Sequence, residues 1–70
     1  LVIDLRGGDE TSGLVSTGAH RSTVDGVDAL AGQARNHRTI LCCRSGLRAW
    51  NAGLRLQQAG CSDILLIALG

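Results

Sequence analysis

The chain has 70 residues, which is enough for one domain with a small hydrophobic core. Its seven basic residues are all Arg, are spread along the chain against six carboxylates and leave a net charge of +1, so no basic patch indicates nucleic-acid binding. The longest apolar run, at residues 64–69, is too short to span a membrane.

Three cysteines, Cys42, Cys43 and Cys61, are an odd number without the regular spacing of a disulfide framework. We therefore expect reduced thiols and a cytoplasmic protein. No charged start followed by an apolar segment indicates a signal peptide. Because the sequence opens and closes directly on apolar runs, we interpret residues 1–70 as a single, partial domain that is truncated at both ends.

The first half predicts one strand and one helix. Residues 1–6, LVIDLR, are typical of a buried strand, and residues 7–18, rich in Gly, Ser and Thr, predict a loop. Residues 19–23 form either a short strand or an extension of that loop. Ser22 or Thr23 is a candidate cap for a helix over residues 24–35. Its apolar stripe comprises Val24, Val27, Leu30 and Ala31.

The second half predicts a strand at residues 39–42, an amphipathic helix at 47–59 that ends at Gly60, and a strand at 63–68. The polar helix face comprises Arg48, Asn51, Arg55 and Gln58, and the apolar arc comprises Ala49, Trp50, Gly53, Leu54 and Leu56, with Trp50 expected to pack under the preceding loop. Strand, helix and strand within 30 residues predict parallel strands buried on both faces. The fold class is therefore α/β, a small parallel sheet flanked by helices.

The stretch LCCRSGLRAW, residues 41–50, carries the candidate chemistry. Cys43 ends a predicted strand and precedes a helix N-terminus, the place where α/β sheets bind ligands. That helix N-terminus and the nearby Arg44 and Arg48 favour a thiolate. Gly46 allows the loop to curl so that its backbone N–H groups form a nest for an anion. We expect the loop to stabilise a thiolate, a persulfide anion or a bound oxyanion.

Two families use a loop of this kind, and the double cysteine fits both at first sight. Protein tyrosine phosphatases have five residues between the nucleophile and an Arg, which is the spacing from Cys42 to Arg48. In that register Leu41 stands in place of the usual His, Gly46 comes one position late, and Ala49 replaces the usual hydroxyl residue. Counted from Cys43 instead, CRSGLRA resembles the active loop of the rhodanese family.

The resemblance to rhodaneses covers essentially the whole chain. LVIDLR resembles the opening strand with its Asp-x-Arg end. ETSGLVSTGA resembles the family's Glu-x-x-x-Gly-His-Ile-Pro-Gly-Ala segment, with one extra residue and with Leu14 and Thr17 in place of the His and the Pro. Residues 39–70 resemble the strand, active loop, helix and next strand. The family's segment before the opening strand and its last helix have no counterpart in these 70 residues.

The resemblance implies a sulfurtransferase of the thiosulfate sulfurtransferase type. Cys43 would take a sulfur atom from a donor such as thiosulfate, carry it as a persulfide and pass it to a thiol or cyanide. The substrate-binding loop would comprise Arg44, Ser45, Gly46, Leu47 and Arg48: its backbone N–H groups stabilise the persulfide, and its two Arg side chains hold the anionic donor. The resemblance implies no metal or organic cofactor. Asp4 and Arg6, at the end of a strand, are expected to support the site as a structural ion pair or by fastening the loop rather than to take part in catalysis.

Two other functions stay open. One is a Cys-dependent phosphatase or arsenate reductase with a similar anion loop. The other is a non-catalytic rhodanese-like module, used by a larger protein to contact its other domains or a partner protein. Neither a nucleic acid nor a membrane is expected as a partner. Among the remaining residues, Cys42 is expected in the core, Cys61 in the core or a loop, and His20 and His37 at the surface.

Overall fold

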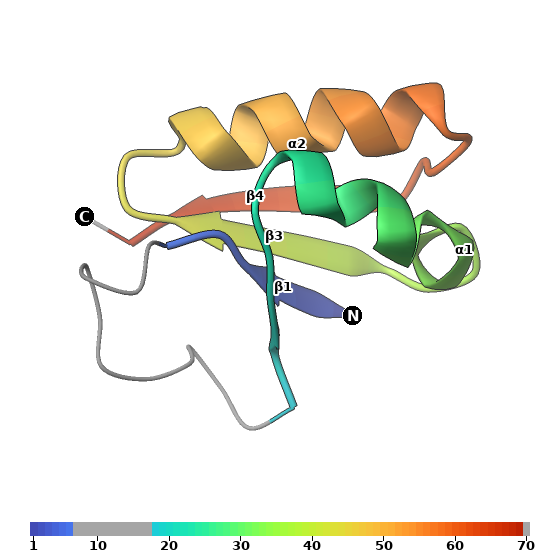
Figure 1. The fold of residues 1–70 in the computed structure, drawn as a ribbon, viewed down its shortest axis with the longest axis horizontal. Helices are drawn as coiled ribbons and strands as arrows, with labels where there is room; N and C mark the ends of the chain where they lie inside the picture. The colour runs from blue at the N-terminus through green and yellow to red at the C-terminus, as the bar shows by residue number, and fades with distance from the viewer. Residues whose placement is uncertain (7–17, 70) are drawn as a thin grey trace.

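The computed structural model describes residues 1–6 and 18–69, so the expected loop at 7–18 and its Leu14 and Thr17 lie outside the described residues, apart from Gly18. The elements in chain order are β1 (Val2–Asp4), β2 (His20–Arg21), the 3-10 helix η1 (Asp25–Leu30), α1 (Ala31–Ala34), β3 (Thr39–Cys43), α2 (Leu47–Gln58) and β4 (Ile64–Ala68) (Figure 1). The four strands form one parallel sheet in the order β2-β1-β3-β4. The structure thus confirms a small α/β domain.

The segment predicted as one helix at residues 24–35 consists of η1 followed by α1. Val24 occupies the N-cap position, and the Thr23 hydroxyl accepts a hydrogen bond from the backbone N–H of Gly26 (3.0 Å). Gly26 and Gly32 both favour non-helical conformations in this short sequence, which accounts for an irregular helical segment. Val27 is completely buried, as its place on the predicted apolar stripe required.

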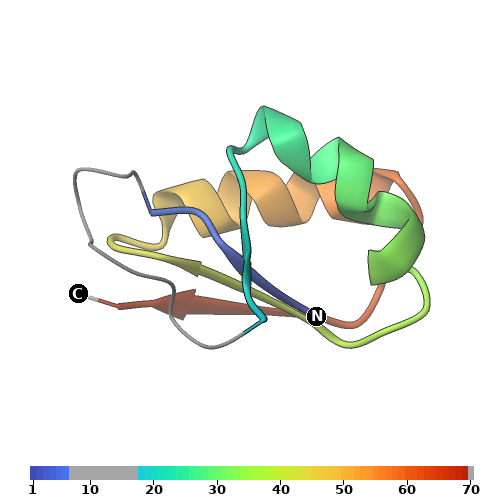
Figure 2. The ribbon, with the colours of Figure 1, turned by 60° about the horizontal axis from the view of Figure 1, so that its bottom comes forward.

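The helical segments and the strands share one hydrophobic core on a single face of the sheet. Figure 2 shows η1, α1 and α2 on the same side of the strands. The buried cluster contains Ile3, Leu5, Leu41 and Cys43 from the sheet side, Val27, Ala31 and Ala34 from η1 and α1, Ala49, Ala52 and Leu56 from α2, and Cys61. In the part of the chain that the structure describes, this is an arrangement of two layers.

The prediction that the strands are buried on both faces is wrong for β4. Leu65, Leu66 and Ile67 are each at least 40% exposed. Two causes act together. β4 is an edge strand. In addition, Leu66 points toward Gly53 of α2, so Leu65 and Ile67 point to the face of the sheet without described helices (Figure 2). The apolar sequence of β4 was therefore a sign of strand formation but not of complete burial.

The prediction that Trp50 packs under the loop is also wrong, because its side chain is 57% exposed. Helix α2 lies on the sheet through Leu56 near its C-terminal end and, near Trp50, through the small residues Ala49, Ala52 and Gly53. A Cβ atom at Gly53 would lie 3.3 Å from Leu66 Cδ2, so the helix is already close to β4. This orientation leaves Trp50 at the margin of the interface. Across residues 1–6 and 18–69, the helices are too short or too polar to cross a membrane.

Candidate active site

The loop between β3 and α2 places two backbone N–H groups against the sulfur of Cys43. Gly46 donates to Cys43 Sγ at 2.9 Å, and Ala49 donates to the same atom at 3.3 Å. Gly46 is the N-cap residue of α2 and has φ 92°, a left-handed conformation that residues with a Cβ atom rarely adopt. The curled loop therefore points the positive end of the α2 dipole and two N–H donors at one sulfur atom.

The two adjacent cysteines have different surroundings. Cys43 contributes to the core between the sheet and the helices, whereas Cys42, the next residue along the strand, points to the opposite face. Cys42 is the register partner of Asp4 on β1 and of Ile67 on β4. Burial, and secondarily the Asp4 carboxylate, raise the pKa of the Cys42 thiol above its ordinary value. The N–H groups of the loop thus donate to Cys43. The raised pKa of Cys42 favours its neutral thiol form.

The side chains of the loop residues differ in their hydrogen bonds and surroundings. Arg48 reaches back from the first turn of α2, and its Nη1 donates to the backbone carbonyl of Leu5 at 3.3 Å. Ser45 Oγ accepts a hydrogen bond from the Leu47 N–H at 3.4 Å, within the turn. Arg44, Ser45, Leu47 and Arg48 are exposed, and Leu47 is exposed to 65%. Arg48 therefore fastens the loop to the end of β1, while Arg44 faces solvent.

Asp4 and Arg6 form the ion pair that the sequence predicted. Arg6 Nε donates to Asp4 Oδ1 at 3.1 Å, Arg6 Nη2 donates to Oδ2 at 2.9 Å, and the Arg6 backbone N–H also donates to Oδ1 at 3.0 Å. The side-chain hydrogen bond from Arg6 lowers the pKa of Asp4, although burial acts in the opposite direction. The pair fixes the end of β1, next to the Leu5 carbonyl that Arg48 contacts.

Sequence reasoning missed Arg21 as a member of this group. Arg21 Nη2 lies 3.6 Å from Asp4 Oδ2, and Arg21 is the register partner of Asp4 on β2. An open cavity of about 760 Å³ lies at the carboxyl ends of β1 and β2, and Arg6, Arg21 and Arg48 all contribute to its wall together with Ser22 and Thr23. In the sequence, the possible strand at residues 19–23 was the one indication of this arrangement. Its register against the first strand was not predicted.

The remaining predicted residues lie where the sequence placed them. Cys61 is buried, and its Sγ donates to the Ala31 carbonyl at 3.7 Å. His20 and His37 are exposed. Among the residues that the structure describes, no group of three or more His, Cys, Asp and Glu side chains is arranged to hold a metal ion. Cys43 itself is almost completely buried, with 1% of its surface exposed.

Comparison of the chain with protein-family models, with curated proteins and with solved structures found no match. The comparisons therefore add nothing to the resemblance of the Cys43 loop to rhodaneses. What the structure itself establishes is a small α/β domain in which the sulfur of Cys43 lies at a helix N-terminus and accepts hydrogen bonds from two backbone N–H groups.

Proposed function

We propose that this chain is a sulfurtransferase of the rhodanese type, with Cys43 as the nucleophile that carries the sulfur. The observation that supports the proposal most is the pair of N–H donors, from Gly46 and Ala49, on Cys43 Sγ. Donors fixed in this way stabilise negative charge on sulfur without any reorganisation during the reaction. The loop sequence CRSGLRA adds the family resemblance.

The proposed reaction has two steps in which atoms and electrons balance. The Cys43 thiolate attacks the outer sulfur of thiosulfate; a new S–S bond forms, the original S–S bond breaks, and sulfite leaves with the bonding electron pair. The enzyme then holds a persulfide anion. A thiolate or cyanide attacks the terminal sulfur of this group, and the Cys43 thiolate leaves. Neither step requires an oxidant, a reductant or a metal.

The charges around the loop favour an anionic donor. Arg44 is exposed beside Cys43, and the cavity at the ends of β1 and β2 has guanidinium groups from Arg6, Arg21 and Arg48 in its wall. Arginine is well suited to bind oxyanions because its planar group presents several N–H donors. In this proposal Arg44 contacts the donor, and Arg48 positions the loop through Leu5.

One observation favours the second candidate, a non-catalytic interaction module. Cys43 is only 1% exposed, so a donor reaches its sulfur only when the loop at residues 44–47 moves outward. Because Arg44, Ser45 and Leu47 are exposed, such a movement would not require these side chains to leave the core. A chain whose loop stays closed would keep the fold and have no sulfur chemistry.

The test is to incubate the chain with thiosulfate and measure its intact mass. The proposal predicts a gain of one sulfur atom, its loss on addition of cyanide with formation of thiocyanate, and no gain in Cys43→Ser. Cys42→Ser is the matched control, because it alters the neighbouring thiol and is expected to keep the gain.

Any other result would point to a different nucleophile or a different function. Sulfur uptake that persists in Cys43→Ser and disappears in Cys42→Ser would reject the proposed nucleophile. Hydrolysis of an aryl phosphate without sulfur uptake would favour a phosphatase. A folded chain with neither activity would favour the interaction module.

A further inference from the structure

The edge of the sheet formed by β4 is apolar and open to a partner. The strand order places β4 at one edge, and no described strand pairs with its outer side. Residues 64–69 contain no charged residue, no Pro and no Gly. Four of their side chains are 40–48% exposed, namely Leu65, Leu66, Ile67 and Leu69. Natural sheets usually protect such an edge with charges, Pro or a bulge, and β4 has no protection of the first two kinds.

The outward backbone groups of β4 can be assigned from its pairing with β3. At one end Thr39 N–H donates to Asp63 O, and at the other end Leu69 N–H donates to Cys43 O, both at 2.8 Å. Both contacts use odd-numbered residues of this segment. Because the N–H and C=O groups of a strand alternate in direction, those of Ile64, Leu66 and Ala68 face away from β3.

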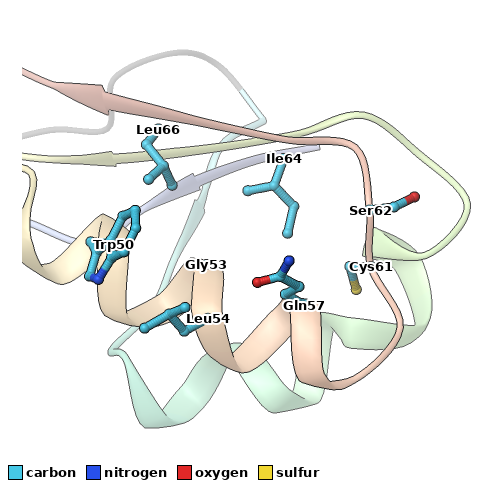
Figure 3. Close-up of a pocket in the computed structure, with 8 residues that line it drawn as sticks. All are labelled: Trp50, Gly53, Leu54, Gln57, Cys61, Ser62, Ile64 and Leu66. Carbon is cyan, nitrogen blue, oxygen red and sulfur yellow. The ribbon is translucent and has the colours of Figure 1, made fainter.

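A groove above this edge continues the apolar surface onto α2. It has a volume of about 210 Å³ and lies between α2 and β4, away from the Cys43 loop. Trp50, Leu54 and Leu66 contribute to its wall, and Figure 3 shows Trp50 and Leu66 close together at one end of the groove. Trp50 and Leu54 are 57% and 40% exposed.

We propose that the occupant of this edge is a second copy of the same chain, paired antiparallel through β4 about a two-fold axis at Leu66. In this register each Leu66 exchanges both backbone hydrogen bonds with its counterpart, and Ile64 of one copy does the same with Ala68 of the other. All the outward groups are thereby satisfied. On the open face of the sheet, Leu65 of one copy lies opposite Ile67 of the other.

The exposed apolar area sets the upper limit of what such a dimer can bury, and this limit matches a standard interface. The six exposed side chains of the edge and the groove present about 540 Å² per copy, if a fully exposed side chain is taken at about 200 Å². A stable interface buries about 800 Å² per partner, and in homodimers about 65% of this area is apolar. The apolar part is therefore about 520 Å² per partner, close to the area that β4 and the groove present. The absence of charge along residues 64–69 also means that two copies meet without repulsion.

The opposite edge of the sheet explains why pairing would stop at two copies. It is formed by β2, which has only two residues, His20 and Arg21, and both are exposed. A short strand with a cationic side chain is a poor template for a further strand. The two-fold pairing of β4 therefore gives a closed dimer with eight strands rather than an open fibre.

The experiment measures mass and fluorescence of the chain over a range of concentrations. Sedimentation equilibrium should give a species of twice the 7.3 kDa chain that dissociates on dilution. Trp50 is the only aromatic residue, so its emission reports on the groove alone and should shift to shorter wavelength as the dimer forms. A chain that is monomeric throughout, or that forms an unlimited series of larger species, would overturn the proposal.

Two double variants test the register. Leu65→Lys/Ile67→Lys places like charges opposite each other across the axis and should raise the dissociation constant at least about tenfold. Leu65→Lys/Ile67→Glu places opposite charges there and should restore the dimer. Ala29→Lys/Gln33→Lys adds the same charge at exposed positions of η1 and α1 and should leave the dissociation constant unchanged.

Circular dichroism of each variant establishes that it is folded. Equal dissociation constants for the two β4 variants would contradict the register, and an equal effect of the control variant would show that net charge rather than the β4 edge governs association. These measurements do not involve sulfur transfer, so they stand or fall independently of the proposed function.

Discussion

Asp4 and Cys42 lie opposite each other on the paired strands β1 and β3. Their neighbours Ile3, Leu5 and Cys43 face the core under the helices, so Asp4 and Cys42 face the other side of the sheet. Burial raises the pKa of Cys42, and the Asp4 carboxylate raises it further. The next residue, Cys43, instead accepts hydrogen bonds from Gly46 and Ala49. One step along the strand thus separates a thiol whose pKa is raised from a sulfur that accepts two backbone hydrogen bonds.

The first prediction concerns the alkaline stability of the fold. Because the pKa of Cys42 is raised in the folded state, the unfolded chain loses this proton first as the pH rises, and the free energy of unfolding should fall above the ordinary thiol value of 9.0. Cys42→Ala should make this fall shallower. The chain has no Lys or Tyr, so urea unfolding between about pH 8 and 11 follows mainly the thiols. Identical pH profiles for the two proteins would contradict the raised pKa.

The second prediction concerns the ion pair at the end of β1. The pKa of Asp4 is lowered by Arg6, so the stability that it contributes is present above the unfolded value of 3.8 and is lost as the pH falls below it. Asp4→Asn should lower the free energy of unfolding at pH 7 by about 2–3 kcal/mol, because it leaves the partly buried donors of Arg6 with a neutral, weaker acceptor. Its stability should then depend less on pH between about 2 and 5. A variant as stable as the original chain at neutral pH would show that the pair is not structural.

The third prediction concerns the left-handed turn at Gly46. Gly46→Ala should cost about 1–2 kcal/mol of stability, since φ is 92° and a Cβ atom is unfavourable there. Among the described residues, the new Cβ would meet only Ala68 Cβ, at 3.5 Å, so the expected cost is conformational rather than steric. Sulfur uptake should fall with it, because the turn directs the Gly46 N–H to Cys43.

Gly32→Ala is the matched control for this turn. Gly32 lies in α1, and an added Cβ would have no described residue outside its own helix within 4 Å. The substitution should stabilise the chain by about 0.5–1 kcal/mol. Sulfur uptake should be unaffected. If the two variants were equally stable in denaturant unfolding, the conformation assigned to Gly46 would be wrong.

The fourth prediction separates two arginines of the loop. Arg48→Gln should lower the free energy of unfolding by about 1 kcal/mol, since Arg48 donates to the Leu5 carbonyl. Arg44→Gln, at an exposed position, should leave stability unchanged and raise the KM for thiosulfate. Thermal unfolding and initial rates of thiocyanate formation measure the two effects. Equal losses of stability would contradict the assignment of Arg48 as a positioning residue and Arg44 as a substrate contact.

Much of the fold could be predicted because the signals were local. Residues 39–42 and 63–68 were apolar runs of strand length, and residues 47–59 combined a helical period with a Gly stop. The position of Cys43 followed from the same pattern. The cytoplasmic location and the small-molecule partners stay predictions.

The features that were missed depend on how elements pack. The exposure of Trp50 results from the rotation of α2 on the sheet, which small side chains and Leu66 determine. The approach of Arg21 to Asp4 depends on the register of β2, which the sequence of a strand of two residues does not specify. The open face of β4 depends on where the helices lie.

The most direct test of the central claim is to locate the sulfur within the chain. After treatment with thiosulfate, the peptide containing Cys42 and Cys43 is isolated without reductant and fragmented between the two residues in a mass spectrometer. The account predicts the added sulfur on Cys43 and none on Cys42, because two backbone N–H groups stabilise charge at Cys43 and burial opposes it at Cys42. Sulfur found on Cys42, or divided equally between the two cysteines, would contradict it.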